Sequence, residues 1–94
     1  MYLSVTAINE GRAAGEITGW GFDLGGDWNA FDLRPVPWQT SLPATLQAGH
    51  RLTFYKDVDW IKSEARTAGR DGEVRGFVDL ATGRVKSRPR QLDL

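Results

Sequence analysis

The sequence predicts a small all-β protein, an antiparallel barrel of five to seven short strands. Apolar and polar residues alternate with a period of two along several segments, which is typical of strands with one buried face. Clusters of Gly, Asn and Asp separate these segments and favour tight hairpins. The chain has 94 residues, enough for one domain with a limited core. Closing the sheet into a barrel would remove the edges that short sheets otherwise expose.

The first half of the chain predicts three strands. Residues 2–8, "YLSVTAI", place Leu3, Val5 and Ala7 on one face. Residues 15–24 and 28–34 predict a hairpin whose turn uses glycines 25 and 26, which adopt positive backbone angles easily. Prolines 35 and 37 cannot donate to a ladder and end the third strand. The connector that follows, residues 39–49, has room for one helical turn.

The second half predicts a fourth strand and a terminal hairpin. Residues 50–60 resume the alternation, with Leu52 and Phe54 on the inner face. Residues 61–72 fit either a bent continuation of that strand or a short helix capped by Asp59. Residues 73–80 and 84–87 flank a turn. The pattern favours an oligonucleotide-binding-fold-like barrel over residues 1–88 with an extended tail at 89–94; an SH3-like barrel or a small sandwich is the alternative.

Composition argues against several functional classes. Twelve basic and twelve acidic residues cancel, so the overall basic charge of a nonspecific nucleic-acid binder is absent, although the last stretch is locally basic. The chain has no Cys and one histidine, His50, so we expect no metal, no cofactor and no catalytic residues. A hydrolase that uses carboxylates alone is a distant third hypothesis. No apolar run is long enough to span a membrane and no leader is evident, so we expect a cytoplasmic protein without a membrane partner.

Four segments resemble, in order, parts of the cold-shock domains: "INEGR" (8–12), "GWGF" (19–22), "AFDLRP" (30–35) and "LQAGHRLTF" (46–54). In that family, aromatic rings of two ribonucleoprotein motifs stand outward on the barrel and stack on the bases of a single strand. The resemblance implies that Trp20, Phe22 and Phe31 form such a platform. It therefore implies a non-enzymatic module that binds single-stranded RNA or DNA.

Strand parity favours a different arrangement of the same rings. If Trp20 and Phe22 faced outward, Asp23 would enter the core, and an unpaired buried carboxylate is costly. With the rings inward, Asp23 faces water, unless a bulge at one of the glycines reverses the parity. The outward candidates for nucleic-acid contact are then residues of the fourth and later strands: Tyr55, Lys56, Arg75 and Phe77.

The last four residues, Gln91, Leu92, Asp93 and Leu94, resemble the peptide by which bacterial replication and repair proteins dock on the sliding clamp. A basic, proline-containing tail would stay extended and could place its two leucines in apolar pockets. An ordinary frayed end, or Leu92 packed against the barrel, explains the same residues. The sequence thus leaves a second functional class open, a protein-interaction or assembly module that docks through its tail or associates with itself through an exposed strand edge.

Overall fold

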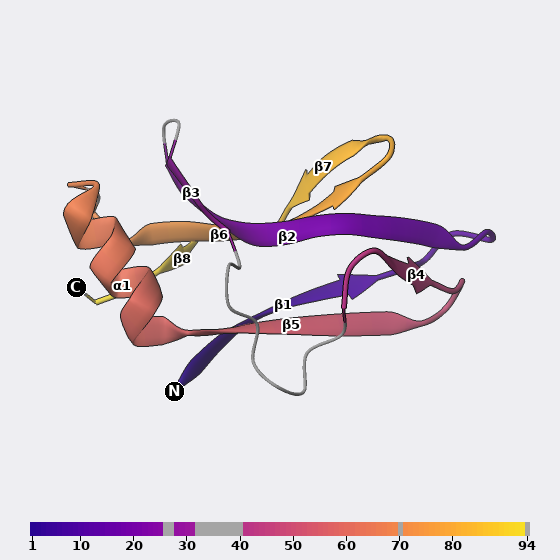
Figure 1. Ribbon diagram of the computed structural model, residues 1–94, viewed down its shortest axis with the longest axis horizontal. Coiled ribbons are helices and arrows are strands. Elements are labelled where there is room, and N and C mark those ends of the chain that lie inside the picture. Colours follow the sequence, from indigo (N-terminus) through magenta and orange to yellow (C-terminus); the bar gives the residue numbers. More distant parts are fainter. Residues whose placement is uncertain (26–27, 32–40, 70, 94) are drawn as a thin grey trace.

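The computed structural model describes residues 1–25, 28–31, 41–69 and 71–93, the side chains of 28–31 excepted, and confirms the all-β class. Two antiparallel layers face each other, with a single helix at one end of the described part (Figure 1). One layer is the pair β1–β5 and the other has the order β3-β2-β6-β7, with β4 added to β2 and β8 to β6. Within the described residues, the layers form an open, barrel-like sandwich and not a closed barrel.

The smaller layer pairs β1 (Tyr2–Ile8) with β5 (Arg51–Asp57) along their whole lengths. Leu3 and Val5 point inward from β1, and Phe54 points inward from β5 with none of its surface exposed. On the outer face the hydroxyl groups of Thr6 and Thr53 are 2.9 Å apart and share a hydrogen bond. This face is mostly polar, as the predicted alternation requires.

The central strand of the larger layer is β2 (Gly15–Gly25), which pairs with β3 (Trp28–Phe31), β4 (Ala44–Leu46) and β6. The β2–β3 hairpin confirms the predicted pairing, and Gly25 has a φ of 97° at its turn. Strand β4 occupies residues for which a helical turn was considered, so that alternative is wrong.

A bulge in β2 changes which side chains reach the core. The register with β6 shifts between Ile17 and Gly19, so two residues of β2 oppose one step of β6. Ile17 and Trp20 are three positions apart, yet both are buried between the layers. The bulge therefore places an apolar residue from each half of β2 on the inner face.

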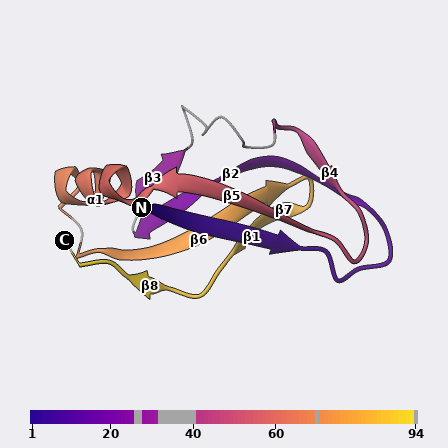
Figure 2. The same ribbon diagram turned by 90° about the horizontal axis from the view of Figure 1, so that it is seen from below.

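The predicted terminal hairpin consists of β6 (Glu73–Leu80) and β7 (Gly83–Lys86). The chain then turns back so that β8 (Arg90–Gln91) pairs with the beginning of β6. Figure 2 shows this return along the edge of β6. The domain thus extends past residue 88, and the boundary predicted there is wrong.

Residues Val58–Thr67 form the helix α1, which decides between the two alternatives for this segment. Its N-cap is Asp57 and not Asp59: the Asp57 carboxylate accepts a hydrogen bond of 2.8 Å from the Asp59 N–H. Val58, Ile61 and Ala65 turn one face of the helix to the core. Asp57 is thus both the last residue of β5 and the N-cap of α1.

The two layers meet through aromatic rings. Trp20 of β2 stacks on Phe54 of β5 with ring centroids 5.1 Å apart and an interplanar angle of 18°. Phe22 meets the edge of Trp20 at 5.9 Å. Because the rings come from opposite layers, this stack fixes the layers against each other.

Candidate functional site

The proposed stacking platform lies inside the protein. Trp20 is 4% exposed and Phe22 is 2% exposed, so neither ring is available to a base. The nucleic-acid role that the resemblance implied for these two residues is therefore wrong, and the parity argument is confirmed. Asp23 lies on the opposite face, where its carboxylate accepts a hydrogen bond of 2.5 Å from the Lys86 ammonium. The side chain of Phe31 lies outside the described part.

Phe77 faces outward, as predicted, but it is only 1% exposed. The Arg84 guanidinium lies 3.8 Å from the centre of its ring and so covers it. Asp79 fixes this guanidinium through two hydrogen bonds, of 2.7 and 3.2 Å. The ring is therefore part of a packed charged surface and is not displayed for stacking, which corrects its assignment to a nucleic-acid site.

The remaining aromatic and basic candidates do not form one site. Lys56 is only 8% exposed, with its ammonium 4.6 Å from the Trp60 ring centre, so it is no exposed phosphate contact. Tyr55 is half-buried on the outer face of the β1–β5 layer. Arg75 lies on the outer face of the other layer, where its Nη1 donates to the Ser87 carbonyl at 3.3 Å. Tyr55 and Arg75 thus face away from each other.

The C-terminal residues are bound to the fold and do not form an extended tail. Leu92 is 7% exposed and belongs to the core. Its N–H donates to the Gly72 carbonyl at 2.8 Å, and the Gln91 amide donates to the Asp71 carbonyl at 2.7 Å. The clamp-docking role that the resemblance implied for these residues stays a prediction; in this structure Leu92 packs in the core and the Gln91 amide is hydrogen-bonded within the fold. Asp93 is exposed, and Leu94 lies outside the described residues.

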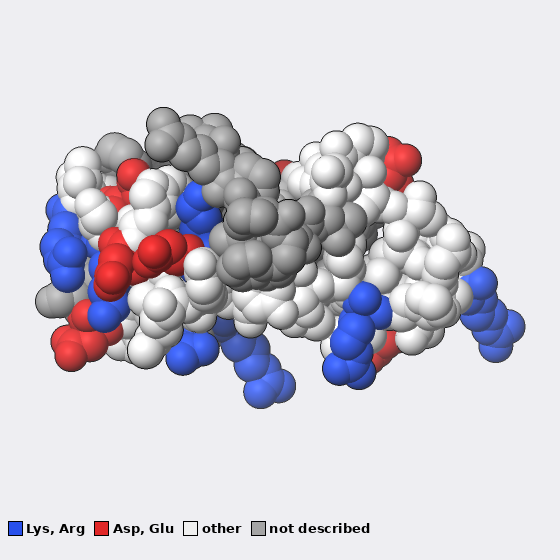
Figure 3. All heavy atoms as spheres, turned by 60° about the horizontal axis from the view of Figure 1, so that its bottom comes forward, with Lys and Arg blue, Asp and Glu red and all other residues white. Residues whose placement is uncertain are grey.

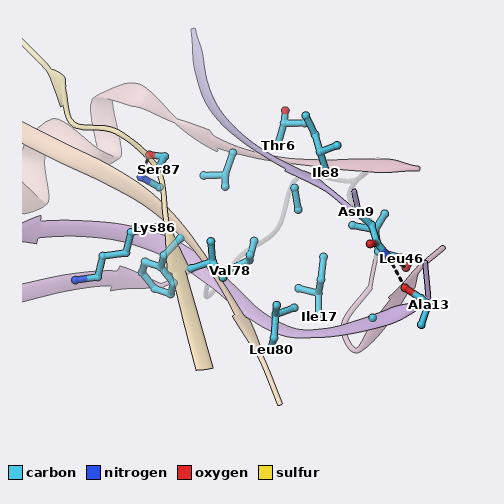
Figure 4. A pocket seen from close by; sticks show the side chains of 16 residues that line it. Thr6, Ile8, Asn9, Ala13, Ile17, Leu46, Val78, Leu80, Lys86 and Ser87 are labelled. Atoms are coloured by element: carbon cyan, nitrogen blue, oxygen red, sulfur yellow. Dashed lines mark hydrogen bonds between the residues drawn. The ribbon is translucent and has the colours of Figure 1, made fainter. Parts of the chain in front are cut away.

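An apolar groove opens between the two layers, next to β1. Its volume is about 360 Å³, and one wall is β1 while the other is β6 and β7 (Figure 4). The apolar lining comes from five elements: Val5 and Ala7, Ile17, Leu46, Val78 and Leu80, and Val85. A cavity of this size and lining accepts apolar side chains.

Asn9 closes one end of the groove. Its amide nitrogen donates to the carbonyls of Ala13 and Leu46, each at 2.9 Å, and its amide oxygen accepts from the Gly11 N–H at 2.9 Å. Figure 4 shows Asn9 between Ala13 and Leu46 at this end. One side chain thus ties the end of β1, the loop after it and β4 together.

Among the described strands only β5 pairs with β1, so the edge of β1 above the groove carries open backbone groups. The N–H of Asn9 donates to the His50 carbonyl and that of Val58 to the Met1 carbonyl, both at 3.0 Å and both in register with the β1–β5 ladder. Ladder hydrogen bonds alternate, so the odd-numbered residues of β1 bond to β5. The N–H and C=O groups of Ser4, Thr6 and Ile8 consequently point away from β5. Thr6 and Ile8 also line the groove.

Two exposed large apolar side chains border the groove. Across the described ranges such side chains are Met1 and Tyr2 at the start of β1, Ile8 at its end, and Val85 on the far wall of the groove. Ile8 is 54% and Val85 55% exposed. Figure 3, with the bottom of Figure 1 turned forward, shows uncharged areas between the charged side chains, and both acidic and basic side chains at the α1 end. Ile8 and Val85 thus place exposed apolar surface on the two sides of the groove.

Among the described residues, two other strand edges carry charged residues where β1 carries none. By the same alternation, the second edge of β5 presents the backbone of Arg51 and Asp57, with Thr53 and Tyr55 between them, and the outer edge of β7 presents that of Arg84 and Lys86. Charged side chains protect a strand edge from further pairing. The sequence predicted an exposed strand edge but did not indicate which strand provides it. The uncharged run "YLSVTAI", without Lys or Pro, is the signal that could have identified β1.

The described residues contain neither a side-chain cluster typical of a metal site nor a helix that could cross a membrane. Within the described ranges, no three His, Cys, Asp or Glu side chains cluster as ligands of a metal ion. No helix in those ranges is long and apolar enough to cross a membrane.

Comparisons of the chain with protein families, with curated proteins and with solved structures found no match.

Proposed function

We propose that this chain is a non-enzymatic protein-interaction module that binds an extended partner segment along β1. The observation that carries the proposal is the uncharged edge of Ser4, Thr6 and Ile8 directly above the apolar groove. In strand addition, main-chain hydrogen bonds supply affinity, and pockets for alternate side chains supply specificity. The β1 edge offers the first and the groove the second.

A pair of proline variants tests the proposal. Thr6→Pro removes an N–H on the open edge of β1, whereas Thr53→Pro removes one on the far edge of β5. Both variants lose the same hydroxyl contact between the two threonines, and neither loses a β1–β5 ladder bond. The two variants thus lose the same side-chain contact and differ in the strand edge at which proline removes the N–H.

The assay is selection of heptapeptides from a displayed library on the full chain, followed by affinity measurement on both variants. We expect selected peptides to bind wild type and Thr53→Pro alike and to lose at least about tenfold affinity on Thr6→Pro, since one hydrogen bond and the fit of the strand are lost. Circular dichroism confirms that each variant is folded. If no peptide is enriched, or if both variants bind equally well, the proposal is wrong.

A second candidate function, binding of single-stranded nucleic acid, rests on one remaining observation. Arg88 and Arg90 are exposed in the basic segment that follows β7, and their guanidinium groups could contact phosphates. Titration of a labelled oligonucleotide at low and moderate salt tests this candidate, with the Arg88→Ala, Arg90→Ala double variant as control. We expect binding that salt and the double variant both weaken; no binding at low salt contradicts the candidate.

A further inference from the structure

We infer that the segment that adds to β1 is the β1 strand of a second copy of this chain, paired antiparallel about Val5. The inference rests on the proposed function, strand addition at β1, and names its partner. It follows from the sequence of the edge, from the exposed residues at its two ends and from the placement of charge around it.

The first argument is that β1 is complementary to itself. In an antiparallel pair centred on Val5, Ser4 lies opposite the partner's Thr6, and Tyr2 lies opposite the partner's Ile8. Pairs of an aromatic with a β-branched residue, and pairs of hydroxyl residues, are favourable across antiparallel strands. The even-numbered residues, whose backbone groups point outward, meet even-numbered residues of the partner. The hydrogen-bonding pattern of the edge therefore fits this register.

The second argument is the position of the exposed apolar side chains. Tyr2 is 50% exposed and Ile8 is 54% exposed, and they stand at opposite ends of the same strand. The two-fold pairing brings Tyr2 of each copy beside the partner's Ile8, and this contact removes both side chains from water. Because each groove lies directly beside the open edge of its own β1, the two grooves meet at the two-fold axis. Val85, exposed on the far wall, then lies next to the dimer interface.

Charge placement is compatible with this pairing. Along β5, Arg51 stands beside Ile8 and Asp57 beside Tyr2. In the dimer, one row of side chains across the four strands runs from Arg51 through Ile8 and the partner's Tyr2 to the partner's Asp57. Its two charged ends are three strand spacings, or about 14 Å, apart. The pairing thus puts opposite charges at the two ends of a row. The β1 strands themselves carry no charge that could repel.

The test is a charge pattern that reports the register. In one double variant, Ser4→Lys with Thr6→Lys, every introduced ammonium faces another across the two-fold axis. In its matched control, Ser4→Glu with Thr6→Lys, the carboxylate at position 4 faces the ammonium at position 6 of the partner. A pairing centred on Ser4 or on Thr6 would instead place like charges opposite each other. Both variants change the same two exposed positions and lose the same hydroxyl contact with Thr53.

Sedimentation velocity of the full chain over a wide concentration range gives the readout. We expect a concentration-dependent dimer for wild type, a loss of about 100-fold or more in dimer affinity for the double lysine variant, and a dimer retained within about tenfold for the control. Circular dichroism shows whether both variants keep the monomer fold. A wild type that stays monomeric, or a control that dissociates as readily as the double lysine variant, overturns the inference.

The outcome also separates this inference from the proposed function. If the wild type is monomeric but peptides selected on β1 bind and lose affinity on Thr6→Pro, strand addition stands and the second copy is excluded. If neither the chain itself nor any peptide adds to β1, both are wrong.

Discussion

Gly76 allows a close approach between the two layers, and alanine at this position should separate them. An ideal Cβ on Gly76 would lie 2.6 Å from Cγ2 of Val5 and 3.3 Å from its Cγ1. Val5 is buried, and its branched side chain has few rotamers with which to avoid the new methyl group. Overpacking of this kind costs about 1 to 3 kcal/mol.

The net loss is smaller than the clash because alanine also restricts the unfolded chain. That effect returns about 0.5 to 1 kcal/mol within a strand, so we expect Gly76→Ala to lower the free energy of unfolding by about 1 to 2 kcal/mol. In a Val5→Ala background both clashing methyl groups are gone, and the remaining Cβ lies at an ordinary 3.4 Å. There the same substitution should raise the free energy of unfolding by about 0.5 to 1 kcal/mol.

Urea unfolding of the four proteins in this double-mutant cycle measures the coupling between the two positions. All four are compared at one low protein concentration, so that association does not contribute to the measured stability. If Gly76→Ala has the same effect in both backgrounds, the contact between the layers is not where we place it.

Three other predictions concern single side chains. Asn9→Ala loses three hydrogen bonds at the end of the groove, and urea unfolding should show a loss of about 1 to 3 kcal/mol; an unchanged midpoint contradicts the role of Asn9. Asp57→Ala removes the cap of α1 and should cost about 0.5 to 2 kcal/mol, with Asp59→Ala as the milder control. The hydrogen bond from Lys86 lowers the pKa of Asp23, so the stability from this pair is full above the pKa of an unfolded aspartate, about 3.9, and is lost as the pH falls through the lower folded pKa. In Lys86→Met, an NMR titration should show a higher pKa for Asp23 than in the wild type. The stability of Asp23→Asn should depend less on pH in this range than that of the wild type, as measured by acid unfolding.

The sequence predicted the strand segments well because their pattern is local. Alternation and turn residues located β1, the β2–β3 hairpin, β5 and the terminal hairpin. The parity of Trp20, Phe22 and Asp23 also followed from neighbouring residues, since side chains alternate along one strand and Asp23 faces out when the adjacent rings face in. The short helix remained ambiguous because ten residues of mixed polarity fit either alternative.

What the sequence could not predict depends on residues distant in the chain. Phe77 faces outward as expected, but only the register of β7 on β6 brings Arg84 over its ring. Leu92 enters the core because β8 returns to the beginning of β6. The groove needs walls from five separate elements, so no local pattern could indicate it. These features concern the candidate site more than the fold, and the site was accordingly predicted less well.

The bulge between Ile17 and Gly19 divides β2 into two parts that pair with different neighbours. Ahead of it the strand pairs with β4, and beyond it with β3, while β6 follows both parts. Because of the extra residue, odd-numbered side chains face inward before the bulge and even-numbered side chains face inward after it. In both parts the apolar side chains therefore face the core. Deleting Thr18 would remove the bulge and leave regular alternation, in which Ile17 and the rings of Trp20 and Phe22 still face inward. For this chain, the odd spacing between two core residues of one strand thus records the one residue that the ladder does not pair.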